Sequence, residues 1–147
     1  MGLNAAFKKK LRELENSINP SIKKAVNDNS TILEVQQTEE QFDKGKDAFN
    51  ISFIPSYAES TKRTKRRKLQ PTNRVTLKDT GDLYNNLTVK GTSSQIVIAP
   101  NVEYFGFLVD HYNNNQILGI QPKAMQEFTD KYICKEIVET FNKLISK

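Results

Sequence analysis

The chain has 147 residues, of which 27% are charged and 37% hydrophobic, and its formal net charge is +5. This length favours one domain with its own core, and no window approaches the roughly 18 consecutive apolar residues that a membrane span requires. One cysteine and one histidine exclude an internal disulfide and leave little material for a metal site or a nucleophile and base pair, so we expect no metal, no cofactor and no enzymatic activity.

A helical N-terminal segment is predicted for residues 1–45. In its first part, apolar residues recur at steps of four, three and four positions, as one face of an amphipathic helix requires. These residues are Phe7, Leu11, Leu14 and Ile18. Pro20 predicts a break or kink near Asn19, because proline lacks the backbone donor that a helix interior needs. A second helix should run from Ser21 to about Phe42 and stop at Lys44-Gly45-Lys46, where the glycine can take a left-handed cap.

Residues 46–73 are predicted to form an extended loop or arm. This segment carries a run of six cations without an acidic residue: Lys62, Arg63, Lys65, Arg66, Arg67 and Lys68. Like charges so close together repel one another, so we expect them to stay in solvent on a mobile segment. Taking these six charges from the net +5 leaves −1 for the rest of the chain. The basic run is therefore the main candidate for contact with a partner.

Antiparallel strands are predicted in the first part of residues 74–147. Val75-Thr76-Leu77 is rich in residues that favour extended chain. Leu87-Thr88-Val89 and Ile96-Val97-Ile98 flank a polar stretch that contains a glycine, so we expect them to pair as a β-hairpin. The aromatic segment that holds Tyr104 should then pack on this small sheet as a short helix.

A long helix is predicted from Pro122 to about Leu144, because apolar residues recur at helical spacing and proline suits a first helical position. We expect Cys134 to be a buried apolar residue of this helix. A polar loop is predicted at residues 111–115, and Asp110-His111, which has no nucleophile motif near it, should form an exposed polar corner. The order of the elements predicts a single domain of the α+β class, with N-terminal helices, a hairpin and a long C-terminal helix.

The stretch from Leu77 to Leu83 has two interpretations. In the first, Thr80-Gly81-Asp82-Leu83 is a tight turn of a structural protein, in which the glycine lets the backbone turn and the aspartate bonds local backbone. In the second, Asp79-Thr80-Gly81 is the catalytic loop of a dimeric, retroviral-type aspartic protease, whose two copies bring together two carboxylates that share one proton. Lys78, the low count of six glycines and the helices predicted at both ends of the chain favour the turn.

The basic run also allows a DNA-binding accessory protein as a third function. Clustered lysine and arginine side chains gain affinity by displacing counterions from phosphates. No aromatic residue lies between Lys62 and Lys68 to stack on bases, so such contact should not depend on the DNA sequence.

Several short motifs, taken in order, resemble those of a family of tailed-phage proteins, the virion-morphogenesis proteins that include tail-completion and head-tail connector proteins of the neck. The resemblance covers about residues 41–144. Its motifs are Tyr57 with Thr61 and Lys65, the turn from Leu77 to Leu83, the paired strands, the tyrosine at position 104, and Ile117-Leu118-Gly119-Ile120 before the terminal helix.

The resemblance implies a structural subunit without enzymatic activity. Such a protein would form a homo-oligomeric ring around the DNA exit channel and join the portal or adaptor to the tail. It would be located in the neck or tail of the virion, and in the cytoplasm of the bacterial host during assembly, without contact to a membrane. In such a ring, the six cations would face an acidic neighbouring protein first, and the packaged DNA second.

Overall fold

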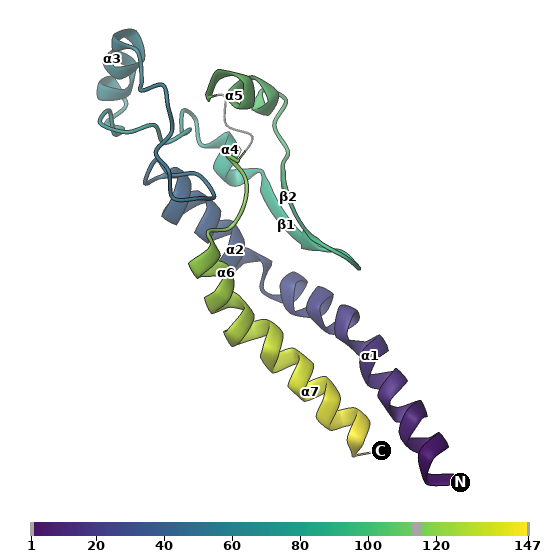
Figure 1. Ribbon diagram of the computed structural model, residues 1–147. Helices are drawn as coiled ribbons and strands as arrows, with labels where there is room; N and C mark the ends of the chain where they lie inside the picture. The colour runs from purple at the N-terminus through teal and green to yellow at the C-terminus, as the bar shows by residue number, and fades with distance from the viewer. Residues whose placement is uncertain (1, 113–115, 147) are drawn as a thin grey trace. The chain divides into compact units, whose positions relative to one another are not determined.

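The computed structural model of the protein describes residues 2–112 and 116–146. Of the polar loop predicted at residues 111–115, positions 113–115 lie outside the described residues, and a loop is wrong for positions 111 and 112, which end a helix. Helices combine with one small antiparallel sheet of two strands, which confirms the predicted α+β class (Figure 1). Among the described helices, none has both the length and the apolar character needed to cross a membrane. The chain forms two compact units, residues 1–30, 89–97 and 126–147 and residues 31–88 and 98–125.

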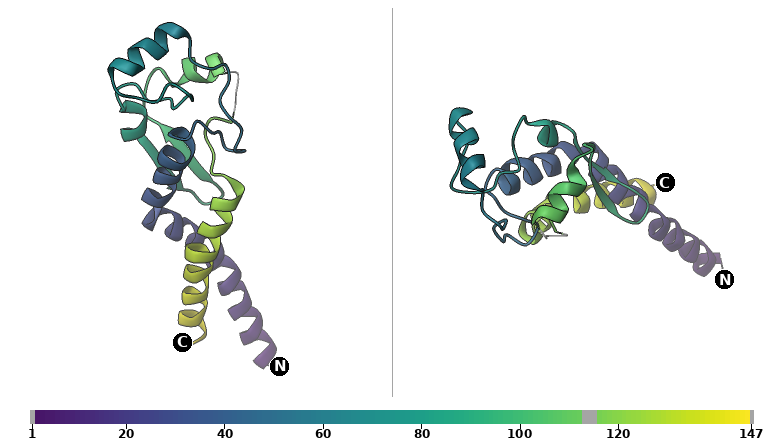
Figure 2. Two further views of the ribbon diagram at one scale, coloured as in Figure 1. Left: turned by 90° about the vertical axis from the view of Figure 1, so that its left-hand side faces the viewer. Right: turned by 90° about the horizontal axis from the view of Figure 1, so that it is seen from above.

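The first unit contains the two helical ends of the chain. α1 (Gly2–Asp28) packs against α7 (Cys134–Ile145), as Figures 1 and 2 show. α7 follows directly on α6 (Pro122–Phe128) and on a π-helical turn, η2 (Thr129–Ile133). Helical chain therefore covers every residue from Pro122 to Ile145, which confirms the predicted C-terminal helix.

Side-chain contacts fix how α1 and α7 pair. The Ser21 hydroxyl donates a hydrogen bond to Thr140 Oγ1 at 3.1 Å, and Lys24 Nζ contacts Glu136 Oε2 at 2.8 Å. The residue number rises along α1 as it falls along α7, so the two helices are antiparallel. Ser21 is buried in this contact, and the hydroxyl pair thus satisfies polar groups that lie inside the unit.

Two local expectations about these helices are wrong, a break near Asn19 and a buried Cys134. α1 continues through Pro20. The carbonyl that loses its donor there belongs to Asn16, and both residues are exposed, so water can bond that carbonyl. Cys134 is exposed, not buried. It lies beside Ile133, which is buried, because neighbouring helical positions point in directions about 100° apart.

The predicted hairpin forms from β1 (Leu87–Gly91) and β2 (Ile96–Pro100). Thr92 closes it, because its N–H and its hydroxyl both donate to the Gln95 carbonyl, at 2.8 and 3.0 Å. Gly91 lies against α1, and its N–H donates to Asn27 Oδ1 at 2.8 Å. A Cβ atom at Gly91 would lie 3.0 Å from the Val26 side chain and 3.1 Å from the Lys23 carbonyl oxygen, so a larger residue would require these neighbours to shift.

The second unit surrounds an apolar core. Its first helical elements are α2 (Ser30–Val35) and the π-helical η1 (Gln36–Phe42), and the helix stops where Gly45 takes a φ of 71°, as the sequence predicted. Short helical segments follow later in the chain, α4 (Asp82–Asn85) and α5 (Phe105–Tyr112). The buried core consists of Phe42, Phe53, Val75, Leu77, Leu83, Leu87, Tyr112 and Ile117.

Two fully buried glutamines of η1 hold the loop before the C-terminal helix. The Gln37 amide donates to the Ile117 carbonyl at 3.2 Å and accepts from the Gly119 N–H at 2.9 Å. The Gln41 amide donates to the Gly119 carbonyl at 2.8 Å and accepts from the Gln121 N–H at 3.2 Å. Two side chains thus satisfy four backbone groups of a loop that has no strand or helix of its own.

Candidate partner-contact site

The basic run forms a helix, so the predicted extended arm is wrong for these residues. α3 (Glu59–Arg67) contains five of the six cations, and Lys68 follows it directly. Glu59 lies in the first turn and the cations of the last turn lie at the negative end of the helix dipole, which favours both. Lys62 Nζ also contacts Glu59 Oε1 at 2.8 Å. These attractions offset the repulsion between like charges.

Lys65 is buried, although we expected all six cations in solvent. Its ammonium group donates to the Lys78 carbonyl and, at 3.0 Å, to Gln70 Oε1. Its Nζ atom also lies 4.7 Å from the centroid of the Tyr57 ring, a cation–π distance. A buried ammonium is tolerated when acceptors replace the water it loses, and here a carbonyl, an amide and an aromatic face do so.

The end of α3 also holds the chain just before the turn. Lys68 forms an ion pair with Asp79, and the Gln70 amide donates to the Asp79 carbonyl at 2.8 Å. Lys65 bonds the preceding carbonyl, that of Lys78. The basic run and the turn motif, which the sequence presents as separate features, are therefore parts of one site.

The six cations divide into two sets. Lys62, Lys65 and Lys68 make contacts within the chain. The other three, Arg63, Arg66 and Arg67, have exposed side chains. Positions three and four residues apart share a face of a helix, so these arginines form one basic surface on α3. We call this surface the arginine face. Within the basic run, it is the candidate surface for contact with a partner.

Thr80-Gly81-Asp82 forms a turn that leads into α4. Gly81 has a φ of 99°, a left-handed conformation that costs other residues free energy. The Thr80 hydroxyl donates to Asp82 Oδ2 at 2.6 Å, and the Asp82 N–H donates to the Thr80 hydroxyl at 3.3 Å. Leu83, the last residue of the motif, is buried in the core. The turn therefore connects the surface site to the core.

Replacing Gly81 by alanine should lower the free energy of unfolding by about 1–2 kcal/mol, measured in urea, because alanine pays for the left-handed backbone. A steric clash does not cause this loss, since the atom nearest to an added Cβ is 3.7 Å away. Gly106→Ala is the matched control. Gly106 is a helical residue of α5 with open space around it, so alanine should stabilise there by up to about 1 kcal/mol. Equal effects of the two substitutions would contradict the conformational explanation.

Tyrosine hydroxyls hold the segment before the turn. The Thr76 N–H donates to Tyr57 Oη at 2.9 Å, and the Tyr84 hydroxyl donates to the Thr76 carbonyl at 2.6 Å. Thr76 is fully buried. The sequence favoured extended chain at Val75-Thr76-Leu77, but this segment belongs to neither strand of the sheet. Side chains bond its backbone groups instead, which satisfies them without a neighbouring strand.

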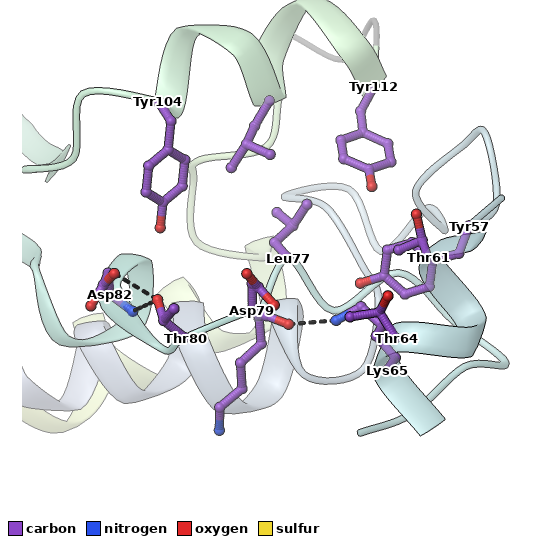
Figure 3. A pocket seen from close by; sticks show the side chains of 12 residues that line it. Tyr57, Thr61, Thr64, Lys65, Leu77, Asp79, Thr80, Asp82, Tyr104 and Tyr112 are labelled. Atoms are coloured by element: carbon purple, nitrogen blue, oxygen red, sulfur yellow. Dashed lines mark hydrogen bonds between the residues drawn. The ribbon is translucent and has the colours of Figure 1, made fainter. Parts of the chain in front are cut away.

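An open pocket of about 370 Å³ lies next to the turn (Figure 3). Figure 3 shows Tyr104 and Tyr112, at the two ends of the α5 region, pointing towards the turn and towards Lys65. The inner face of α3 closes another side with Thr61 and Thr64. The remaining lining residues are Tyr57, Lys65, Leu77, Lys78, Asp79, Thr80, Asp82 and Leu108.

Tyr104 and Tyr112 keep their protons at neutral pH. Burial raises the pKa of Tyr112 to about 12. Burial, and then the negative charge of Asp82, raise the pKa of Tyr104 as well. Neutral phenol and threonine hydroxyls beside Leu77 and Leu108 can hydrogen-bond a peptide and pack against its apolar side chains. The lining is thus suited to holding a segment of another protein.

The residues of the protease interpretation are arranged differently from what it requires. Asp79 is exposed and its carboxylate pairs with Lys68. The sheet has two strands in the described part of the chain, whereas that interpretation needs a fold that is nearly all β. Asp110 and His111 are exposed, as expected, and the imidazole stacks on Phe107 with 5.9 Å between ring centroids. Among residues 2–112 and 116–146, no group of three acidic, histidine or cysteine side chains is placed to hold a metal ion.

Three residues of this site were not predicted from the sequence. Thr64, Leu108 and Tyr112 line the pocket but were not singled out. A signal existed for two of them, because Tyr104, Leu108 and Tyr112 recur every fourth residue and so share one face of a helix. Thr64 carries no such signal, since its role depends on α3 being a helix.

Comparison of the chain with models of protein families, with curated proteins and with solved structures gave no match.

Proposed function

We propose that this chain is a structural subunit of a tailed-phage virion, a tail-completion or head-tail connector protein of the neck that joins the portal or adaptor to the tail. One observation carries this proposal: residues from three of the motifs behind the family resemblance lie together in one pocket. Tyr57, Thr61, Lys65 and Tyr104 line it, together with Leu77–Thr80, although they are spread over almost fifty positions of the sequence. Short motifs that matched the family by chance would not be expected to lie together in one pocket.

The arginine face provides the contact with a neighbouring protein. Guanidinium groups pair with carboxylates in a planar, two-bonded geometry, and three of them on one helix face make a specific surface for an acidic partner. No aromatic residue lies between them to stack on bases, so packaged DNA is the second choice of partner. In a ring, the pocket of one subunit and a different surface of the next make a heterologous contact, which closes on itself.

Loss of the protein tests the proposal directly. In cells infected with the phage that carries the gene, its deletion should leave filled heads and tails unjoined, as counted by electron microscopy. Normal yields of joined particles without the protein would contradict the proposal.

The arginine face is tested with Arg63→Ala/Arg66→Ala/Arg67→Ala. Joined particles should fall by about tenfold or more, because removing charges from a buried protein contact weakens it by several kcal/mol. A control with three other exposed cations removed, Lys9→Ala/Lys90→Ala/Lys143→Ala, should assemble normally. Salt-sensitive binding of the purified protein to bare duplex DNA, lost in the arginine variant, would instead favour the DNA-binding accessory protein.

A further inference from the structure

The first half of α1 carries an apolar stripe that the described chain leaves largely uncovered. Phe7, Leu11 and Ile18 are 62%, 42% and 37% exposed, and Leu14 is half-buried. They form the amphipathic face that the sequence predicts, over about three turns of helix. A contiguous apolar surface of this kind on a soluble unit usually marks an interaction site.

α7 does not extend far enough to cover the N-terminal part of this stripe, which holds Phe7, Leu11 and Leu14. Ser21 pairs with Thr140, and Ser146 lies six residues beyond Thr140, so in antiparallel helices it falls opposite about residue 15 of α1. The part of α1 before that point therefore continues past the end of α7 (Figure 2). This stretch therefore leaves apolar side chains in water, and a partner that covers them would stabilise it.

The stripe matches itself in the antiparallel direction. Its steps of four, three and four residues read the same from either end, so two copies align layer by layer about a point between Leu11 and Leu14. Phe7 of one copy then packs on Ile18 of the other, and Leu11 on Leu14. This is the pattern of a short antiparallel coiled coil, with apolar residues at its a and d positions.

The charges beside the stripe fit the same arrangement. Lys8 follows Phe7 and Glu15 follows Leu14, which gives both the same heptad position, and both are exposed. In an antiparallel pair these positions face each other, so symmetry yields two bridges between Lys8 and Glu15. A parallel pair would instead place Lys10 of one copy opposite Glu15 of the other, so the partner of Glu15 distinguishes the two directions.

We infer that a second copy of this chain covers the stripe, forming a symmetric dimer through antiparallel packing of α1. The contact is isologous, since the same surface serves both copies, and it differs from the heterologous contact that closes a ring. The inference does not depend on the proposed function: a dimer of this kind is expected of the isolated protein whatever assembly it joins.

Sedimentation velocity over a range of protein concentrations tests the inference. The mass should rise from the 16.8 kDa of one chain to twice that value. Leu11→Glu should abolish the dimer while circular dichroism and urea unfolding show a folded monomer, because Leu11 is already exposed to water in one copy. A monomer at every concentration, or a dimer that persists in Leu11→Glu, would overturn the inference.

Charge reversal tests the direction of packing. Lys8→Glu should raise the dissociation constant about tenfold, because it turns two attractive pairs into two repulsive ones. Lys8→Glu/Glu15→Lys should restore it. Lys10→Glu is the matched control, since only a parallel pair would place Lys10 opposite Glu15. Three results would each contradict the antiparallel dimer. These are an effect of Lys10→Glu equal to that of Lys8→Glu, a double variant whose dissociation constant does not recover, and larger assemblies that Lys8→Glu leaves unchanged.

Discussion

Replacing Gln37 by leucine should lower the free energy of unfolding by about 2–4 kcal/mol in urea. The substitution nearly preserves volume, so the loss comes from hydrogen bonds. The Ile117 carbonyl loses its donor and the Gly119 N–H loses its acceptor, and an unpaired buried polar group costs about 1–3 kcal/mol. The local consequence is a loosened loop before the C-terminal helix, so hydrogen exchange at Gly119 should become faster.

A matched control and a double variant make this prediction specific. Gln95 is exposed in the hairpin loop, so Gln95→Leu should change the unfolding free energy by less than about 0.5 kcal/mol. Gln37→Leu/Gln41→Leu should cost less than the sum of the single variants, because both side chains bond Gly119 and the first substitution already frees the loop. Additive costs, or a loss at Gln37 no larger than at Gln95, would show that the two amides do not act as one clamp.

Gln37 and Gln41 show which features of the fold the local sequence pattern does not predict. Both glutamines look like surface residues of an amphipathic helix, and their acceptors and donors lie about 80 positions later. Helical and hairpin segments were predicted correctly where spacing alone decides, as in the stripe that ends at Leu144 and in the strands around Val89 and Val97. Whether a polar side chain is buried depends instead on hydrogen-bond partners far away in the sequence, which local spacing does not reveal.

Errors at α3 and at Pro20 have a related cause. Rules for charge runs and prolines consider only neighbouring residues. They predict the repulsion between like charges and the lost backbone donor, but not the interactions that compensate for them. At α3 the offset is partly local, from Glu59, and partly distant, from the Lys78 carbonyl. At Pro20 the compensating interaction is a hydrogen bond from water to the Asn16 carbonyl, which is possible because α7 does not cover that side of α1.

The candidate site was predicted in pieces. Both the turn at Gly81 and the cations from Lys62 to Lys68 were singled out, because glycine and charge runs are strong local signals. The contact between them was not predictable, since it depends on Lys65 turning inward. The division of the six cations into three lysines that contact other residues of the chain and three exposed arginines follows from helical geometry, which was not predicted for this segment.

Lys65→Met should detach α3 from the turn and lower the free energy of unfolding by about 2 kcal/mol. Methionine can keep the packing of the lysine stem, so the substitution isolates the ammonium group. Its loss leaves the Lys78 carbonyl without its donor and removes the cation–π contact with Tyr57, and relief from burying a charge offsets only part of this cost. Amide hydrogen exchange should accelerate throughout residues 59–67, because Lys65 is the buried residue of α3.

Lys62→Met separates this anchoring role from the loss of one charge. Lys62 makes a solvent-exposed helix-surface pair with Glu59, which contributes little to stability, so its removal should leave hydrogen exchange in α3 almost unchanged. The two variants have the same net charge, so any assembly defect that arises from charge alone must appear in both. If only Lys65→Met also loses joined particles, the arginine face functions because α3 is held in place. If Lys62→Met loosens α3 equally, the helix is held by its own surface pairs, and the buried ammonium is not the anchor.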